Sequence, residues 1–177
     1  MARVRYLSRE DAGPQNQTLF DRLERERKVP TANIFRALAH APAILTEFIS
    51  YANAMRSASI SPRLRELAIL TVGHVTNSEY EIAHHQSHGE KAGISLEQLK
   101  AVPDFETSPL FNDEERAVMA FAKESTLKVD VSEATYERVA AFFPERQLVE
   151  LVLTVAWYNS GVRIMGGLAI ELEEGYR

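Results

Sequence analysis

The stretch that decides the fold is Arg63–Gly93, which reads RLRELAILTVGHVTNSEYEIAHHQSHGEKAG. Its first half is apolar nearly all round from Leu67 to Val75, which is typical of a helix at the centre of a helical protein. Ser61–Pro62 comes before it and provides a helix start, with serine at the N-cap and proline in the first turn. The sequence therefore predicts a central helix that carries a single acid, Glu66.

A second helix is predicted from Glu79 to Lys91, after a break at Asn77–Ser78. Ser78, Glu81 and His85 fall at positions i, i+3 and i+7, so they share one face of that helix. A carboxylate and an imidazole one helical turn apart can pass a proton between them. Four of the five histidines lie within residues 74–88. We therefore place the candidate working site here.

The spacing of Glu81 and His85 fits a surface ion pair equally well, which would stabilise the helix by about 0.2–0.5 kcal/mol. Glu66 lies on an apolar helix, where a buried carboxylate needs a partner because an unpaired one costs several kcal/mol. His85 and Arg63 are the candidate partners for Glu66. The alternative is that Glu66 lies at the edge of the helix, in water.

The composition is that of a soluble globular protein, since 45% of the 177 residues are hydrophobic and 25% are charged. A formal net charge of −5 argues against nucleic acid as a partner. The chain has no cysteine, which excludes disulfides, thiolate nucleophiles and zinc–thiolate sites. The first residues lack the apolar core of a signal peptide, and no uncharged apolar run reaches the roughly 20 residues of a membrane helix. We expect a cytoplasmic protein.

Strand signals are absent, so the sequence predicts an all-α protein. We expect one domain over residues 1–177, with an irregular lead-in over residues 1–16. Besides the two helices above, helices are predicted over residues 17–28, 32–40 (opened by Pro30–Thr31), 95–101 and 132–143, and from Pro42, from Asn112 or Asp113, and from Pro144.

Residues 145–160, ERQLVELVLTVAWYNS, resemble residues 63–78, RLRELAILTVGHVTNS. Both segments have Glu-Leu near the start, an apolar run with Thr-Val, and Asn-Ser at the end. This similarity predicts an internal two-helix repeat, made of two similar helix pairs. A chance match between short apolar segments is the alternative.

The spacing Glu66–x11–Ser78–x2–Glu81–x3–His85 resembles that of the carboxymuconolactone decarboxylase / alkylhydroperoxidase D superfamily. RELAIL, NSEYEIAHH and AGIS carry the resemblance, which covers residues 61–98 and extends loosely to LVELVLTVAWYNSGVRIMGG. It implies a helical bundle of the alkylhydroperoxidase D type. It also implies a homo-oligomer, a trimer or hexamer, with the site near a subunit interface.

The alkylhydroperoxidase D branch has a redox pair, Cys-x-x-Cys, flanked by a glutamate and a histidine. In this chain the two cysteine positions are Ser78 and Glu81, while the flanking acid is Glu66 and the histidine is His85. Serine and glutamate cannot reduce a peroxide by thiolate attack. We therefore expect no thiol peroxidase activity, and the resemblance points to the cysteine-less, decarboxylase-like branch.

That branch implies a lyase-like enzyme that needs no cofactor and moves protons on a small carboxylated lactone or a related carbonyl compound. Loss of carbon dioxide would leave an enolate-like carbanion, which His85 would protonate. The expected catalytic residues are Glu66, Glu81 and His85, and the expected substrate contacts are Ser78, Tyr80, His84 and Arg163. Arg163 would hold the substrate carboxylate, or pair with Glu66 or Glu150 instead.

Two other interpretations stay open. The chain could be a non-catalytic helical binding or assembly protein on the same scaffold. His84 and His88, at i and i+4 beside His85, could also serve a metal-dependent enzyme, although the sequence has no HExxH motif. We expect no metal and no cofactor. Trp157, Tyr158 and Asn159 are expected to provide core or interface surface.

Overall fold

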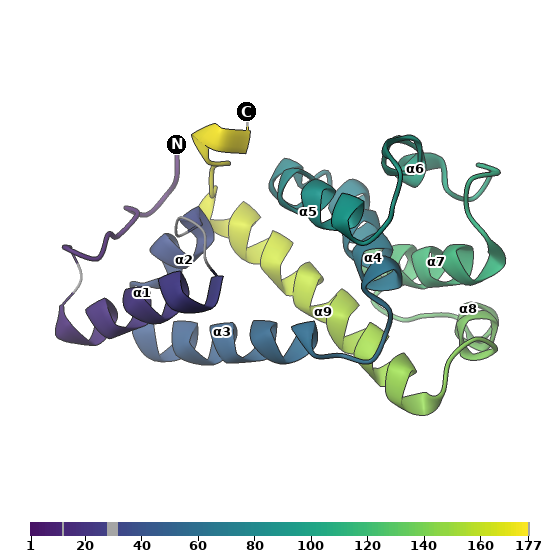
Figure 1. Cartoon of the computed structure of the whole chain (residues 1–177), viewed down its shortest axis with the longest axis horizontal. Helices are drawn as coiled ribbons and strands as arrows, with labels where there is room; N and C mark the ends of the chain where they lie inside the picture. The colour runs from purple at the N-terminus through teal and green to yellow at the C-terminus, as the bar shows by residue number, and fades with distance from the viewer. Residues whose placement is uncertain (12, 28–31, 177) are drawn as a thin grey trace. The chain divides into compact units, whose positions relative to one another are not determined.

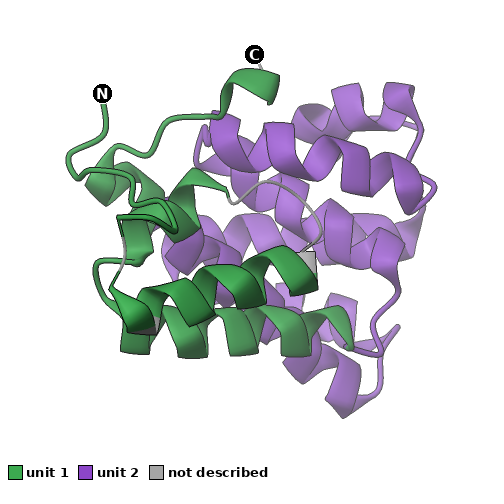
Figure 2. Cartoon of the chain, turned by 60° about the vertical axis from the view of Figure 1, so that its left-hand side comes forward, with its two compact units in different colours: residues 1–57, 164–177 green, residues 58–163 purple. Residues whose placement is uncertain are grey.

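The computed structural model describes residues 1–11, 13–27 and 32–176 (Figure 1). Over these residues the chain forms nine α-helices and two short 3-10 helices, and it has no strand. The prediction of an all-α protein is therefore confirmed. No helix in the described ranges is long and apolar enough to cross a membrane. The chain divides into two compact units, residues 1–57 with 164–177 and residues 58–163 (Figure 2); the prediction of a single domain stays a prediction.

The first unit contains α1 (Pro14–Arg27), α2 (Asn33–Leu38), α3 (Pro42–Arg56), the end of α9 and the short helix η2 (Glu174–Tyr176). Its core is a cluster of buried apolar side chains: Leu7, Leu19, Phe20, Leu23, Ala39, Leu45 and Ile49. The side-chain amide of Asn33 donates to the carbonyl of Glu171, which ties the C-terminal segment to α2.

The irregular lead-in is shorter than predicted, because α1 begins at Pro14 and not after residue 16. Proline suits the first turn of a helix, since its missing N–H would have no partner there. The carbonyl of Gly13 accepts from the N–H groups of Asn16 and Gln17, which closes that first turn. The predicted helix start at Pro30–Thr31 lies outside the described residues.

The second unit contains α4 (Pro62–Val75), α5 (Glu79–Lys91), α6 (Leu96–Ala101), the 3-10 helix η1 (Val102–Asp104), α7 (Asp113–Lys128), α8 (Glu133–Ala140) and most of α9 (Glu145–Leu168). Helix α4 is the central element of this unit, as predicted: every residue from Glu66 to Gly73 is buried, and the helix packs on both α5 and α7. The predicted start of α4 is confirmed, with Ser61 as the N-cap accepting from the N–H of Leu64.

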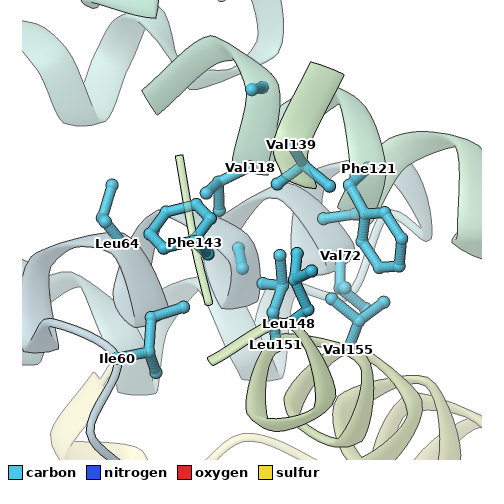
Figure 3. Packing of buried hydrophobic residues seen from close by; sticks show 13 residues of the cluster. Ile60, Leu64, Val72, Val118, Phe121, Val139, Phe143, Leu148, Leu151 and Val155 are labelled. Atoms are coloured by element: carbon cyan, nitrogen blue, oxygen red, sulfur yellow. The ribbon is translucent and has the colours of Figure 1, made fainter. Parts of the chain in front are cut away.

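Two apolar clusters cover different faces of α4. In the first, shown in Figure 3, side chains of α4 meet those of α7, α8 and α9; the labelled members are Ile60, Leu64, Val72, Val118, Phe121, Val139, Phe143, Leu148, Leu151 and Val155. In the second, Leu67 and Leu70 pack with Ile94, Leu99, Val102, Phe105, Phe111 and Met119. Burying each such side chain contributes about 1.5–3 kcal/mol. This double coverage explains why α4 is apolar nearly all round.

The turn between α4 and α5 is tight and local. Asn77 adopts a positive φ of 52°, a conformation that asparagine tolerates better than most residues. Ser78 then caps α5, with its hydroxyl accepting from the N–H of Glu81 at 3.4 Å and its own N–H donating to the carbonyl of Gly73 at 2.8 Å. A Cβ on Gly73 would lie 3.2 Å from Ile82 Cγ1. Glycine at this position therefore lets the two helices approach closely.

The two similar sequence segments do not form similar helix pairs. At Asn77–Ser78 the backbone leaves α4, whereas the matching Asn159–Ser160 lie inside α9, which continues to Leu168. The Asn159 amide finds its partners within the fold, donating to the carbonyl of Val155 and to the hydroxyl of Thr126. Helix α9 continues through these two residues, so the predicted second pair is not formed in the described residues.

Val129, at the end of α7, is the most strained residue of this unit. Its φ of 68° and ψ of −59°, with the N–H of Asp130 donating to the carbonyl of Lys128 at 2.8 Å, define a γ-turn with a positive central φ, a rare and strained conformation. Its side chain is 78% exposed, so packing does not repay that strain.

We expect Val129→Gly to stabilise the protein. Relief of a strained backbone is worth about 1–3 kcal/mol and the added flexibility of glycine costs about 0.5–1 kcal/mol, which leaves a net gain of about 1 kcal/mol. Chemical denaturation monitored by circular dichroism would measure it, with Leu127→Gly, at an exposed position inside α7, as the destabilised comparison. Equal losses of stability in both variants would contradict the assignment of strain to Val129.

Candidate active site

His85 lies between two carboxylates that come from different helices. Its Nδ1 is 2.7 Å from Oε2 of Glu66 on α4, and its Nε2 is 3.5 Å from Oε2 of Glu81 on α5. The side chains of Glu66, Glu81 and His85 are only 7%, 10% and 14% exposed. The structure therefore brings together the three residues that the sequence proposes as catalytic. The alternative of a surface ion pair between Glu81 and His85 is wrong, and so is the alternative of a solvated Glu66.

Each contact in this cluster has a local cause. Glu81 and His85 meet because residues four apart on a helix are neighbours, and Ser78 fixes where α5 begins. Glu66 meets His85 because α4 and α5 pack side by side. The Nδ1 of His85 donates to Glu66, since a carboxylate accepts. This hydrogen bond leaves Nε2, which faces Glu81, as the nitrogen that can gain or lose a proton.

The net effect of burial and nearby charges is to shift the pKa values of both Glu81 and His85 upwards. Burial raises the pKa of Glu81 above its usual value, and the nearby His85 and His84 only partly oppose this effect. Burial alone would lower the pKa of His85. The hydrogen bond to Glu66 and the charges of Glu66 and Glu81 outweigh burial, so the pKa of His85 is raised. The pair therefore retains its protons to higher pH than the free side chains would.

Glu66 has His85 as its hydrogen-bonded partner, and the alternative partner, Arg63, lies elsewhere. The Nε of Arg63 donates to Oε1 of Glu115 at 2.7 Å. The cation nearest to Glu66 is the adjacent Arg65, whose Nε is 3.9 Å from Oε1 and whose side chain is 16% exposed. Its positive charge lowers the pKa of His85, against the larger effect of the carboxylates. Sequence reasoning did not single out Arg65, because arginines near a helix start are usually solvated.

Of the four predicted substrate contacts, Ser78, Tyr80 and His84 lie on or next to α5, and Arg163 lies on α9. Ser78 uses its hydroxyl as the N-cap of α5. Tyr80 is buried, and its ring stacks on that of His84, with centroids 4.4 Å apart and planes 9° apart. These residues lie on the first turns of α5, the helix that carries Glu81 and His85.

Arg163 differs from its prediction. It is exposed, and its Nη1 donates to the carbonyl and to the side-chain oxygen of Asn159 at 2.8 and 2.7 Å. Neither of the structural pairs suggested for it is formed: Glu66 bonds His85, and Glu150 accepts from Arg146 and from the N–H and hydroxyl of Ser59. The reason is the direction of α9, along which Arg163 folds back on its own preceding turn.

The histidine cluster shows no arrangement for a metal. The Nδ1 of His88 donates to the carbonyl of His84 at 2.9 Å, and the ring of His84 is stacked on Tyr80. Among residues 1–11, 13–27 and 32–176, no group of three or more histidine, aspartate or glutamate side chains is arranged to hold a metal ion. The metal-dependent interpretation therefore gains no support from the geometry.

Helix α9 contributes two residues that sequence reasoning missed as part of the site. The ring of Tyr158 lies perpendicular to that of His85, with centroids 4.9 Å apart. Gly161 packs against the carboxylate of Glu81, since a Cβ built on it would be 3.3 Å from Oε1. Tyr158 was expected to provide core or interface surface, and it does pack against the first core cluster. No local signal links α9 to α5, because about 75 residues separate them in the sequence.

Replacing Glu81 by glutamine should stabilise the protein more at pH 8 than at pH 5. The folded-state pKa of Glu81 is raised, so folding favours the protonated acid. Glu81 therefore supports stability below its unfolded pKa, and this contribution is lost as pH rises through the folded pKa. Thermal melts of wild type and Glu81→Gln at both pH values measure the difference. Glu79→Gln, at an exposed position on the same helix, is the control, and an equal effect of Glu81→Gln at both pH values would contradict the prediction.

Comparison with known proteins agrees with this geometry. The family model for the carboxymuconolactone decarboxylase family matches residues 42–124, a range that contains Glu66, Glu81 and His85. The chain is 27% identical over 129 residues to the uncharacterized protein YnjA of Escherichia coli (strain K12), covering 72% of this chain and 70% of the relative. It is also 27% identical over 111 residues to the uncharacterized protein YdfG of Bacillus subtilis (strain 168), covering 62% of this chain and 76% of the relative.

Solved structures share the fold over nearly the whole chain. The debrominase Bmp8 matches with a TM-score of 0.82 at 19% identity, over 97% of this chain and 92% of that one. A peroxidase-related protein from Silicibacter sp. TM1040 gives 0.81 at 16% identity, over 99% and 93% of the two chains. An alkylhydroperoxidase AhpD core protein from Ralstonia eutropha JMP134 gives 0.80 at 16% identity, over 99% and 94%. At these identities the likeness shows the fold alone. Over residues 42–124 the chain resembles the carboxymuconolactone decarboxylase family, it shares the fold of an alkylhydroperoxidase AhpD core protein, and it has no cysteine.

Proposed function

We propose that this protein is a cofactor-independent acid–base catalyst, which transfers a proton at a carbon atom of a small carbonyl compound, as a carboxymuconolactone decarboxylase-like enzyme would. The observation that supports it best is the arrangement of His85, whose two ring nitrogens each face a buried carboxylate. The carboxylate of Glu66 fixes the orientation of this imidazole, and the adjacent carboxyl group of Glu81 can supply a proton to it.

Glu66 is the orienting acid in this proposal. Its short hydrogen bond to Nδ1 fixes the tautomer of His85 and stabilises the imidazolium form when Nε2 takes up a proton. The same division of labour holds a catalytic histidine in hydrolytic triads. Arg65 lies beside Glu66 and partly balances its charge.

Glu81 is the second proton carrier. Its Oε2 lies 3.5 Å from Nε2 of His85, which is too long for a strong direct hydrogen bond. A modest movement, or a substrate group between the two, would complete the transfer. Because both pKa values are raised, the pair keeps a transferable proton at higher pH than the separate groups would. One proton shared by two coupled groups gives macroscopic pKa values that belong to the pair.

The chemistry of a carboxylated lactone uses these parts in order. The bond between the ring carbon and the carboxylate breaks, and its electron pair stays on that carbon as an enolate. Carbon dioxide leaves, Nε2 of His85 gives its proton to the carbon, and a new C–H bond forms. Glu81 then returns a proton to Nε2 and regains its own from solvent. The step needs no thiol, which fits a chain that has none.

The partners in this proposal are a small-molecule substrate and further copies of the chain, in the cytoplasm. Val149 and Val152, three residues apart on one face of α9, are 56% and 43% exposed, and a second copy of the chain could cover such an apolar face. Assembly as a trimer or hexamer would cover it.

The central prediction concerns His85. We expect His85→Gln to lower turnover at least about 100-fold, because general acid–base groups contribute about 10²–10⁴ in rate. Carbon dioxide release from carboxylated lactones and β-oxo acids, and deuterium uptake from heavy water at the carbon next to their carbonyl, would measure it by NMR. His40→Gln is the matched control, since His40 is exposed and hydrogen-bonded to the carbonyl of Arg5.

Glutamine keeps an N–H donor for Glu66, so both variants should keep the circular dichroism spectrum of the wild type, which separates lost chemistry from lost folding. Undiminished turnover in His85→Gln would rule out the acid–base role. If wild type neither turns over these compounds nor exchanges their hydrogens, the non-catalytic binding or assembly interpretation is favoured instead.

For the assembly, light scattering coupled to size-exclusion chromatography at micromolar concentration should give three or six times the mass of the chain. Val149→Glu combined with Val152→Glu should lower that mass, because charges on the exposed face of α9 cannot be buried in an apolar contact. A wild-type monomer would contradict the proposed assembly.

A further inference from the structure

One turn of α9 touches both members of the His85–Glu81 couple. Tyr158 and Gly161 are three residues apart and therefore share a face of the helix. The Tyr158 ring stands at 90° to that of His85. Gly161 is buried, and its position for a Cβ is 3.3 Å from Oε1 of Glu81. Tyr158 therefore contacts His85 and Gly161 contacts Glu81, and the separation of His85 and Glu81 decides whether a proton can pass between them.

We propose that Tyr158 and Gly161 are positioning residues, through which α9 holds the imidazole of His85 and the carboxylate of Glu81 face to face. The reaction that this serves rests on the proposed function. The positioning itself is a property of the protein without substrate.

Tyr158 limits the movement of the imidazole. The hydrogen bond from Nδ1 to Glu66 fixes one edge of the ring but permits tilting about that bond. Tyr158 packs against the first core cluster, which holds its own ring in place. A perpendicular aromatic contact at 4.9 Å is a favourable geometry. It therefore opposes the tilt that would turn Nε2 away from Glu81.

Gly161 provides the space in which the carboxylate of Glu81 lies. One oxygen of Glu81 faces His85 at 3.5 Å and the other lies against Gly161, so the carboxylate is confined between α5 and α9. A methyl group at position 161 would meet Oε1 at a distance shorter than an ordinary van der Waals contact. Glycine inside a helix is less favourable than alanine, and at position 161 the absence of a side chain leaves room for the carboxylate.

Other glycines of the same helix do not share this property. A Cβ on Gly166 or Gly167 meets no atom within 4 Å. Gly166→Ala is therefore a matched control for Gly161→Ala, with the same chemical change on the same helix and no carboxylate in its way.

Several charged or titratable groups determine how His85 titrates, and each must stay unchanged in the test. From α4, α5 and α9 they are Glu66, Arg65, Glu81, His84, His88 and Tyr158. Substitutions at Gly161, and of Tyr158 by phenylalanine, leave all the carboxylates, imidazoles and guanidiniums of this set in place.

The test follows the titration of His85 by NMR, with histidine labelled at its ring carbons and nitrogens. The His85 signal is the one missing from the His85→Gln spectrum. In Gly161→Ala we expect its midpoint to shift by about 0.5 pH unit or more, because the methyl group displaces the carboxylate of Glu81 and changes its distance from the imidazole. Gly166→Ala should leave the midpoint unchanged.

Tyr158 is tested in the same way by Tyr158→Leu and Tyr158→Phe. The leucine variant should shift the midpoint of His85 and broaden its signal, and the phenylalanine variant, which retains the ring, should restore the wild-type titration. A general loss of packing would not be repaired by the ring alone. Unchanged His85 midpoints in both Gly161→Ala and Tyr158→Leu overturn the inference.

The two proposals can fail separately. If the midpoints move but wild type shows no turnover with any carbonyl compound, the positioning stands and the proposed function falls. If wild type is active, and the pH dependence of kcat/KM is the same in Gly161→Ala and wild type, the proposed function stands and the positioning falls.

Discussion

The structure of the second unit depends on one short hydrogen bond, between Nδ1 of His85 and Oε2 of Glu66 at 2.7 Å. A buried carboxylate without a partner would destabilise the fold by several kcal/mol. Glu66 lies on the helix that both apolar clusters cover, so water cannot hydrate it there. The imidazole of His85 meets this need, and α5 must lie where it does for the bond to form.

That requirement couples the fold to the site. The turn at Asn77–Ser78 sets the start of α5, and Gly73 lets α5 approach α4 closely. Because Glu81 and His85 are four residues apart on α5, they lie on the same face, and burial of His85 also places Glu81 in a buried position. Neither acid is at the surface. Burial raises the pKa of Glu81, whereas the hydrogen bond to Glu66 and the charges of Glu66 and Glu81 raise the pKa of His85 against the opposing effect of burial. The shifted pKa values of His85 and Glu81 are therefore a consequence of how α4 and α5 pack.

The likeness of this fold to peroxidase-related structures does not bring thiol chemistry to a chain without cysteine. The scaffold is shared over nearly its whole length with peroxidase-related structures. The positions that the resemblance assigns to cysteine hold Ser78 and Glu81, and here Ser78 caps a helix while Glu81 faces an imidazole. A carboxylate has no accessible redox change, so an acid at this position cannot carry out the redox chemistry of a thiol.

The sequence alone determined the helical class, the limits of α5, the central place of α4 and the placement of Glu81 and His85 on one helix face. Each of these follows from short-range rules, namely periodicity, capping and the spacing of polar groups on an apolar helix. Only the tertiary structure decided the surroundings. It placed Arg63 with Glu115, turned Arg163 back onto Asn159, kept α9 continuous through Asn159–Ser160, and brought Tyr158 and Gly161 of α9 against the site. These outcomes depend on contacts between helices that are distant in sequence. The packing of several helices together determines the partner of each side chain. A local sequence pattern therefore does not predict these partners.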